Sequence, residues 1–214
     1  TIAMAHELES GKLRRKVIDD YTAQTIAGLK LLIDNLHRTA DLVVRFKGLA
    51  VSQSNAQRKQ FSLDDILKAS VTIKRRTLGE TPIAIDLALS GEMAMDSYPE
   101  AIDQMFSNLI DNAIVHGFAD RGHGTIKIEA SIEREHVRII FKDNGCGMVD
   151  EVRAHVFDPF FTTRLGHGQS GLGMSVCYNL VTNLLGGSID VASTPGKGCV
   201  YVIVLPVSAP FEQG

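Results

Sequence analysis

The chain has 214 residues, of which 44% are hydrophobic and 22% charged, and its formal net charge is -3. This is the composition of an ordinary soluble globular protein, and the charge does not indicate nucleic acid or an anionic membrane surface as a partner. Three cysteines without a CxxC pair argue against a disulfide framework or a zinc site, and no run of about 18 apolar residues could span a membrane. The chain begins without methionine inside a helical pattern, which we interpret as a cytoplasmic fragment of a parent protein that can itself carry a membrane anchor.

The first third of the chain predicts one long helix. Between Ile18 and Ala50, apolar and threonine side chains recur at alternating steps of four and three residues, which is the spacing of a helix in a bundle or coiled coil. Such a helix cannot bury its apolar stripe alone, so it needs a partner helix. The polar segment 52–60 indicates a linker. We therefore predict a helical region over residues 1–55 and a second domain over residues 56–214.

The second domain shows alternating helix and strand patterns. We expect a helix from Leu63 to about Leu78 with Ser62 as its cap, and another that starts at Pro99 and ends at the cap residue Gly117. Strands are predicted over 83–89, 125–132 and 136–143, a helix over 171–185, and a final hairpin over 187–194 and 198–206. This is an α+β arrangement, a mixed sheet with helices on one face.

Two asparagines lie on one face of the second of these helices. Asn108 and Asn112 are four residues apart in SNLIDNAIVHG. Carboxamides beside apolar neighbours are costly to bury without partners, and their oxygens are suitable ligands for Mg2+ beside phosphates. Taken alone, the pair is explained better by capped or solvent-facing asparagines. His116, at the end of the helix, is more often a helix-end cation than a ligand.

The strand over 136–143 ends in the loop DNGCGM, which starts at Asp143. A carboxylate at a strand end can accept a hydrogen bond from an exocyclic amine such as that of adenine. Gly145 and Gly147 would let the backbone lie against a flat ring. Loops of this kind are also common as ordinary turns. We interpret Cys146 as a small filler rather than a nucleophile.

Residues 158–170 have almost no regular apolar pattern and lead into a helix start. We expect a mobile lid, because long irregular loops inside compact domains are usually functional. Phe157, Phe160 and Phe161 would anchor it to the core. Glycines and polar side chains near a helix N-terminus suit phosphate binding. The glycines are Gly166, Gly168, Gly171 and Gly173, and the polar residues are Thr162, Thr163, Arg164 and His167.

In this order, the motifs resemble those of the ATP-binding domain of sensor histidine kinases. NLIDNA is similar to the N box of that family, DNGCG to its G1 box, FDPFF to its F box and GQSGLGM to its G2 box. The resemblance covers roughly residues 61–206. It implies the Bergerat fold, an α/β sandwich within the α+β class, preceded by a long helical dimerisation hairpin.

The resemblance also implies ATP and Mg2+ as ligands. Asp143 would recognise the adenine amine, and Asn112, helped by Asn108, would coordinate Mg2+ on the triphosphate. The other implied nucleotide-binding residues are His116, Gly145, Gly147, Phe161, Thr163, Arg164, Gly168, Gly171, Leu172 and Gly173. The family often has a lysine or arginine where this chain has Val115, so the phosphate charge would have to be met by other residues, for example His116, Arg164 or His167.

AMAHEL resembles the start of the family's H box, with His6 as the phosphoacceptor and Glu7 as its proton acceptor. The chain then departs from the family pattern, because the first helix of a hairpin should be about as long as the second. We hypothesise that a stretch after Leu8 is absent from this sequence. A Cα–Cα distance of about 3.8 Å between Leu8 and Glu9 would contradict that hypothesis.

The resemblance favours a histidine kinase core. It would bind ATP, phosphorylate His6, pass the phosphoryl group to an aspartate of a response-regulator receiver domain, and form a homodimer through a four-helix bundle. It would contact neither nucleic acid nor a membrane. One alternative is an ATPase clamp of the same superfamily, but the helix over 99–116 has no glutamate after Glu100 to activate water. The other alternative is a degenerate, non-catalytic signalling partner, and the intact glycines and Asp143 argue against it.

Overall fold

The computed structural model describes residues 21–26, 28–29, 57–119, 121–164 and 170–210. The chain divides into two compact units, residues 1–46 and 47–214. In the first unit, residues 21–26 and 28–29 are helical, as the seam predicts. The rest of the long helix, His6, Glu7, the junction after Leu8 and the predicted boundary after residue 55 lie outside the described residues. No helix in the described ranges has the length and hydropathy needed to cross a membrane.

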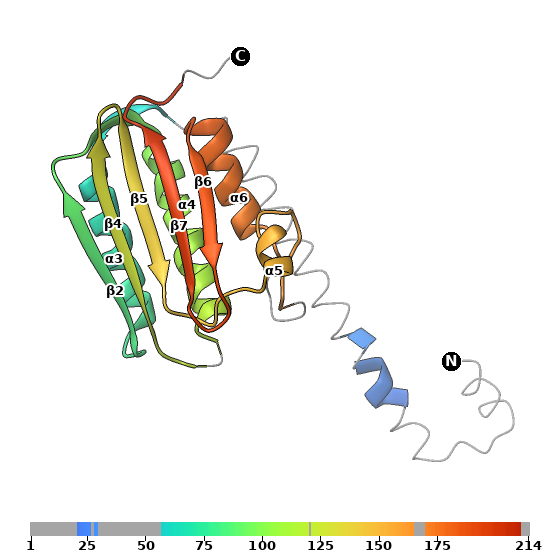
Figure 1. Ribbon diagram of the computed structural model, residues 1–214. Coiled ribbons are helices and arrows are strands. Elements are labelled where there is room, and N and C mark those ends of the chain that lie inside the picture. Colours follow the sequence, from blue (N-terminus) through green and yellow to red (C-terminus); the bar gives the residue numbers. More distant parts are fainter. Residues whose placement is uncertain (1–20, 27, 30–56, 120, 165–169, 211–214) are drawn as a thin grey trace, which may run out of the picture. The chain divides into compact units, whose positions relative to one another are not determined.

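The second unit is built on a five-stranded sheet with the strand order β2-β4-β5-β7-β6 (Figure 1). Its strands are β2 (Ile83–Ser90), β4 (Gly124–Glu133), β5 (His136–Asp143), β6 (Ser188–Ser193) and β7 (Cys199–Pro206). β2 and β4 are parallel, and the other neighbouring pairs are antiparallel, so the sheet is mixed as expected. A separate antiparallel pair joins β1 (Lys59–Ser62) and β3 (Ala94–Ser97).

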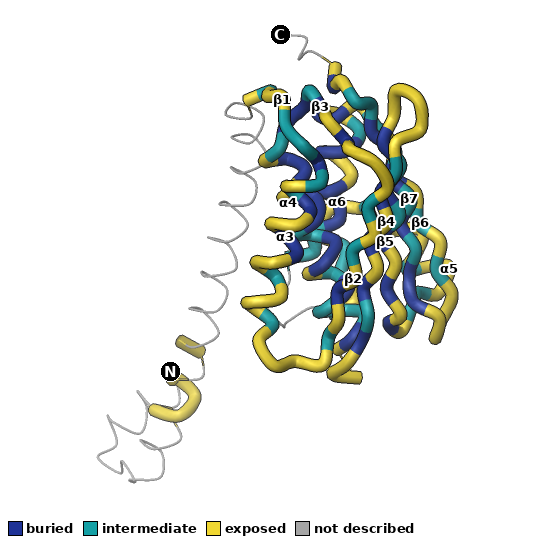
Figure 2. Tube along the Cα trace, turned by 90° about the vertical axis from the view of Figure 1, so that its left-hand side faces the viewer, coloured by how far each residue is buried: buried dark blue, intermediate teal, exposed yellow. Residues whose placement is uncertain are grey.

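Three helices lie on one face of the five-stranded sheet (Figures 1 and 2). They are α3 (Leu63–Leu78), α4 (Pro99–Asn112) and α6 (Gly173–Asn179), and the short α5 (Asp150–Ala154) lies near β6. A π-helical turn extends α4 as η1 (Ala113–Gly117), and another extends α6 as η2 (Leu180–Leu184). This one-sided arrangement confirms the predicted α+β class and mixed sheet.

The core forms where the helices meet the sheet. Every second residue of β5 and β7 is buried over most of each strand, because neighbouring side chains of a strand point to opposite faces. The buried stripe of α4 faces them and includes Met105, Phe106 and Leu109, all 0% exposed. Burial of each such side chain stabilises the fold by roughly 1.5–3 kcal/mol. The packing of α4 against the sheet therefore fixes the position of both ends of this helix relative to the strands.

Several local details differ from the sequence-based expectations. Ser62 immediately precedes α3, as expected of a cap residue, but its side chain makes no capping hydrogen bond. The last helix starts at Gly173 rather than Gly171, because Gly171 has a φ of +67°, which is incompatible with a helix. The short elements β1, β3 and α5 were not predicted, since four or five residues give little periodic signal.

Candidate nucleotide-binding site

The predicted N-box and G1-box segments meet at the end of α4. Gly117 and Gly145 are in backbone contact, since a Cβ placed on Gly145 would lie 2.6 Å from the Gly117 Cα. The backbone N–H of Cys146 donates to the Gly117 carbonyl at 2.9 Å. The predicted role of Gly117 as a C-cap glycine is therefore wrong, because the helical turn continues to this residue and Phe118 follows as its cap. Gly117 instead gives the DNGCG loop room to pack.

Asp143 is the buried acid of this site. It is 2% exposed at the end of β5. Its Oδ1 accepts the backbone N–H of Gly145 at 2.8 Å and that of Cys199 at 3.3 Å, whereas Oδ2 accepts no backbone N–H from the described residues. Burial raises the pKa of Asp143, and the two backbone N–H groups and the Cys199 thiol partly offset this effect. One carboxylate oxygen is thus fixed by the fold, and the other remains available to a ligand donor.

The glycines around Asp143 are required by backbone packing. A Cβ on Gly147 would collide with the Thr194 carbonyl, and one on Gly198 with the backbone of Asp143. Both residues also have positive φ, +68° and +79°, where side chains other than glycine are strained. Backbone packing alone therefore requires glycine at Gly145 and Gly147. Their predicted place beside the flat ring of the base stays a prediction.

Asn112 and Asn108 share a face of α4, as predicted, but their carboxamides have different surroundings. Asn112 donates through Nδ2 to the Tyr201 hydroxyl at 3.2 Å, and its Oδ1 accepts no hydrogen bond within the described residues. Asn108 accepts from Gln104 at 3.0 Å through Oδ1, and its buried Nδ2 has no hydrogen-bond partner among the described residues. The oxygen available for a ligand is therefore that of Asn112, while Asn108 is held by its helix neighbour.

His116 links the π-helical turn η1 to the predicted lid. Its Nδ1 lies 3.1 Å from the Thr163 hydroxyl oxygen. Burial, and secondarily the positive charge of Arg164, lower the pKa of His116. These surroundings favour the neutral imidazole over the helix-end cation that the sequence suggested. His116, Thr163 and Arg164 come together, although 47 residues separate the first two.

The predicted lid and G2-box residues lie beside this group as far as they are described. Gly171 packs on the backbone of Phe160 and Phe161, where a Cβ would lie 2.5 Å from the Phe160 carbonyl carbon. Leu172 is 4% exposed and belongs to the buried core, so only its backbone can serve a ligand. Gly173 opens α6 and faces open space. Residues 165–169, which include Gly168 and His167, lie outside the described residues, so the predicted lid mobility stays a prediction.

The residues present fit a metal ion that is held mainly by a ligand. No group of three or more His, Cys, Asp or Glu side chains within the described ranges could hold a metal ion. A magnesium ion here would need the oxygens of a nucleotide together with a hard protein oxygen, and Asn112 Oδ1, which accepts no other hydrogen bond from described residues, is suited to that role.

Sequence reasoning missed Gly198, Cys199 and Tyr201 as parts of the site. The pattern PGKG marks a turn before β7, but nothing in it shows that Gly198 packs on Asp143. The pairing of Tyr201 with Asn112 joins residues 89 positions apart. The neighbouring Cys146, interpreted from the sequence as a small filler, is exposed, and its thiol donates to the His116 carbonyl at 3.3 Å.

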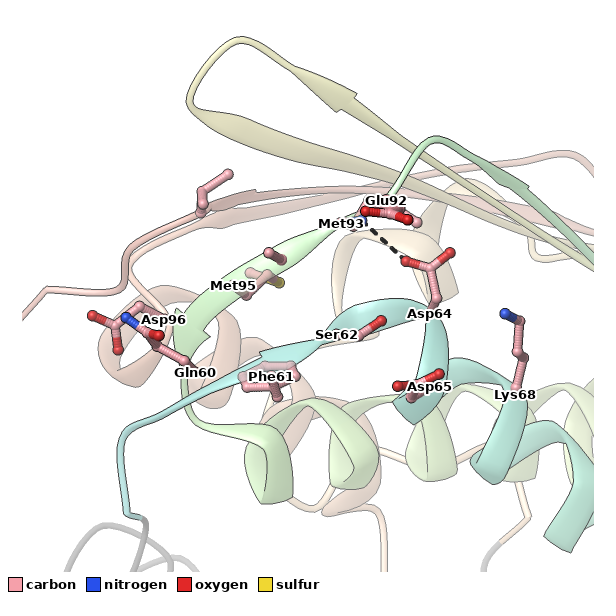
Figure 3. A pocket seen from close by; sticks show the side chains of 12 residues that line it. Gln60, Phe61, Ser62, Asp64, Asp65, Lys68, Glu92, Met93, Met95 and Asp96 are labelled. Atoms are coloured by element: carbon pink, nitrogen blue, oxygen red, sulfur yellow. Dashed lines mark hydrogen bonds between the residues drawn. The ribbon is translucent and has the colours of Figure 1, made fainter.

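A cavity of about 700 Å3 lies where β1, β3 and the start of α3 meet (Figure 3). Two of its acids already have partners: Asp64 accepts the Met93 N–H at 3.1 Å, and Asp96 pairs with Arg58 at 2.9 Å. The cavity is separate from the candidate site, because β3 precedes the first turn of α4 whereas Asn112 ends that helix.

Comparisons with known proteins identify the family of this chain. Residues 97–209, just over half of the chain, match the family of histidine kinase-, DNA gyrase B-, and HSP90-like ATPases. The signal transduction histidine-protein kinase AtoS of Escherichia coli is 24% identical over 203 residues, which are 94% of this chain and 32% of AtoS. Sporulation kinase E of Bacillus subtilis is 26% identical over 216 residues, 98% of this chain and 28% of that kinase. This chain thus spans about a third of the length of these relatives.

Solved structures share the fold. The catalytic domain of histidine kinase ThkA superposes with a TM-score of 0.63 at 24% identity, covering 71% of this chain and 97% of that domain. Full-length ShkA in complex with AMPPNP gives a TM-score of 0.65 at 23% identity, covering 97% of this chain and 42% of ShkA. The chain therefore belongs to the family of histidine kinase-, DNA gyrase B-, and HSP90-like ATPases, and within that family it is similar to sensor histidine kinases.

Proposed function

We propose that this chain is the core of a histidine kinase that binds Mg-ATP, phosphorylates His6 and passes the phosphoryl group to an aspartate of a response regulator. The observation that carries this proposal is the buried Asp143. Its Oδ1 is held by two backbone N–H groups, while Oδ2 has no backbone donor in the part of the chain that the structure describes. A ligand that brings an exocyclic amine, as adenine does, would satisfy that second oxygen.

The other residues of the site would act on the triphosphate. Asn112 Oδ1 would serve as the protein ligand of Mg2+, which when bound neutralises phosphate charge. Asn108 would assist Asn112 indirectly and would not bind the ion itself, since its own oxygen accepts a hydrogen bond from Gln104. Thr163 and Arg164 would meet the phosphates from the lid side, with His116 held as a neutral donor or acceptor beside Thr163. The backbone of Gly171, Leu172 and Gly173, with Gly168, would offer N–H groups to phosphate oxygens, and Phe161 would hold the lid to Gly171.

The transfer step would use the sequence around His6. A ring nitrogen of His6 forms the new bond to the γ-phosphorus, and the bond from that phosphorus to the bridging oxygen breaks, so ADP leaves. The proton of the attacking imidazole passes to Glu7. Imidazole suits this chemistry, because one ring nitrogen can attack while the other is hydrogen-bonded. Two copies of the helical region would supply the four-helix bundle on which the histidine is presented.

An ATPase clamp of the same superfamily is the second candidate. It needs a general base that activates water, and α4 carries no glutamate after Glu100. Incubation with γ-labelled ATP separates the candidates. Label retained on the protein and transferred to a receiver domain supports the kinase. Release of labelled phosphate with an unlabelled protein supports the clamp, and absence of ATP binding supports a degenerate, non-catalytic partner.

A further inference from the structure

Tyr201 carries a buried hydroxyl that points at the candidate metal ligand. The residue lies on β7 and is 0% exposed. Its hydroxyl oxygen accepts the Nδ2–H of Asn112 at 3.2 Å. A buried tyrosine hydroxyl usually finds a hydrogen-bond partner, and Asn112 is the one that the described residues provide.

This contact constrains the asparagine. A carboxamide has a donor edge and an acceptor edge. With Nδ2 turned toward Tyr201, Oδ1 points away from it and accepts no hydrogen bond within the described residues. Asn108, one turn earlier, has the opposite arrangement: its Oδ1 accepts from Gln104, and its buried Nδ2 has no partner that the described residues provide. Of the two asparagines, Asn112 is the one whose NH2 group binds the sheet and whose oxygen is thereby available to a ligand.

The ring and the hydroxyl of Tyr201 have separable tasks. The ring packs edge-on against Phe141, with centroids 6.1 Å apart, and belongs to the core between the sheet and the helices. A phenylalanine would keep that packing. The hydroxyl adds one thing, a hydrogen bond that reaches from the sheet to the last residue of α4.

We propose that Tyr201 is a positioning residue, whose hydroxyl holds the Asn112 carboxamide with Oδ1 turned toward Mg2+ on the nucleotide. The inference rests on the proposed function, because it assumes that Asn112 is the protein ligand of that ion. Tyr201 itself touches neither metal nor nucleotide in this scheme. It lowers the cost of ordering Asn112 when Mg-ATP binds.

The test compares nucleotide affinity with and without the ion. AMPPNP binding is measured by calorimetry in excess Mg2+ and in EDTA for the wild type, Tyr201→Phe, Asn112→Ala and the double variant. Tyr201→Phe should weaken Mg-AMPPNP binding about three- to tenfold, the value of one lost hydrogen bond, and leave metal-free binding unchanged. The double variant should bind no more weakly than Asn112→Ala. Tyr98→Phe, a buried tyrosine at the other end of α4, is the matched control.

The results that would overturn the role of Tyr201 differ from those that would overturn the metal role of Asn112. Equal losses in Mg2+ and in EDTA would show that the hydroxyl serves only stability, and an unchanged Tyr201→Phe beside a weakened Asn112→Ala would also overturn the inference. If Asn112→Ala keeps its full Mg2+ dependence, the metal role in the proposed function falls, and the inference with it. A readout in the nucleotide-free protein is also available. The side-chain NH2 signals of Asn112 should shift in Tyr201→Phe and stay in place in Tyr98→Phe.

Discussion

Replacement of Asp143 by asparagine separates the fold of this site from its function. Asparagine keeps an Oδ1 that can accept the N–H groups of Gly145 and Cys199. The substitution replaces the other carboxylate oxygen by an NH2 group. This group and the exocyclic amine of adenine are both donors, so no hydrogen bond could form between them. A hydrogen bond to a charged group contributes about 1.5–3 kcal/mol, so ATP affinity should fall about ten- to a hundredfold.

The stability of the nucleotide-free protein should change in the opposite direction. Burial raises the pKa of Asp143 above its ordinary value. A raised pKa means that the folded state favours the protonated acid, so stability is greatest below the unfolded pKa and falls as pH rises through the folded one. At neutral pH the buried charge is therefore a cost. Asp143→Asn should unfold at a higher temperature than the wild type at pH 7, and the difference should shrink as the pH falls toward 4.

Calorimetry with two nucleotides tests the assignment of Asp143. The wild type should prefer ATP to the purine-riboside triphosphate that lacks the exocyclic amine, and Asp143→Asn should lose that preference. Asp190→Asn, an exposed aspartate on β6, is the control for charge alone. Equal ATP affinity in wild type and Asp143→Asn, or an equal loss for both nucleotides, would refute the role of Asp143 in recognising the base.

Three further outcomes are expected. Gly198→Ala should destabilise the fold more than Gly196→Ala. Both residues have a φ of +79°, but only a Cβ on Gly198 would meet the Asp143 backbone. Equal losses of unfolding free energy in urea, about 1–2 kcal/mol for each variant, would show that backbone strain alone causes the loss. Cys146 is the exposed one of the three cysteines, so a maleimide should modify it first, and ATP should slow the reaction; mass spectrometry that finds no protection would place the nucleotide elsewhere. Because the pKa of His116 is lowered, the folded state favours its neutral form, and the resulting stabilisation is present above pH 6.5 and is lost as the pH falls. The Tm of His116→Gln should therefore drop less between pH 7.5 and 5.5 than the Tm of the wild type.

The sheet and the main helices could be predicted from the sequence because their patterns are local. The strand predicted over 136–143 is β5, and the helix predicted from Leu63 to about Leu78 is α3. The alternation of apolar and polar residues in the strand and the apolar periodicity of the helix both follow from neighbours within a few residues. The order of the strands was less accessible, because β7 lies between β5 and β6 through contacts that no short segment encodes.

The candidate site was predictable in its motifs and not in its contacts. Asp143 and Asn112 stand in short patterns that the sequence displays openly. Their partners Cys199 and Tyr201 lie 56 and 89 residues away, so only the folded sheet brings them in. The same limit explains His116, which as a helix-end residue suggests a cation, while its tertiary surroundings favour the neutral form.

The most direct test of the central claim is to locate the phosphoryl group after incubation with γ-labelled ATP. The chain should acquire label that is labile in acid and stable in base, as a phosphorylated imidazole is. His6→Ala should abolish the label, and His37→Ala, a histidine on the predicted long helix, should retain it. Label that survives in His6→Ala, or phosphate released into solution with no labelled protein, would contradict the proposal that this chain is a histidine kinase core.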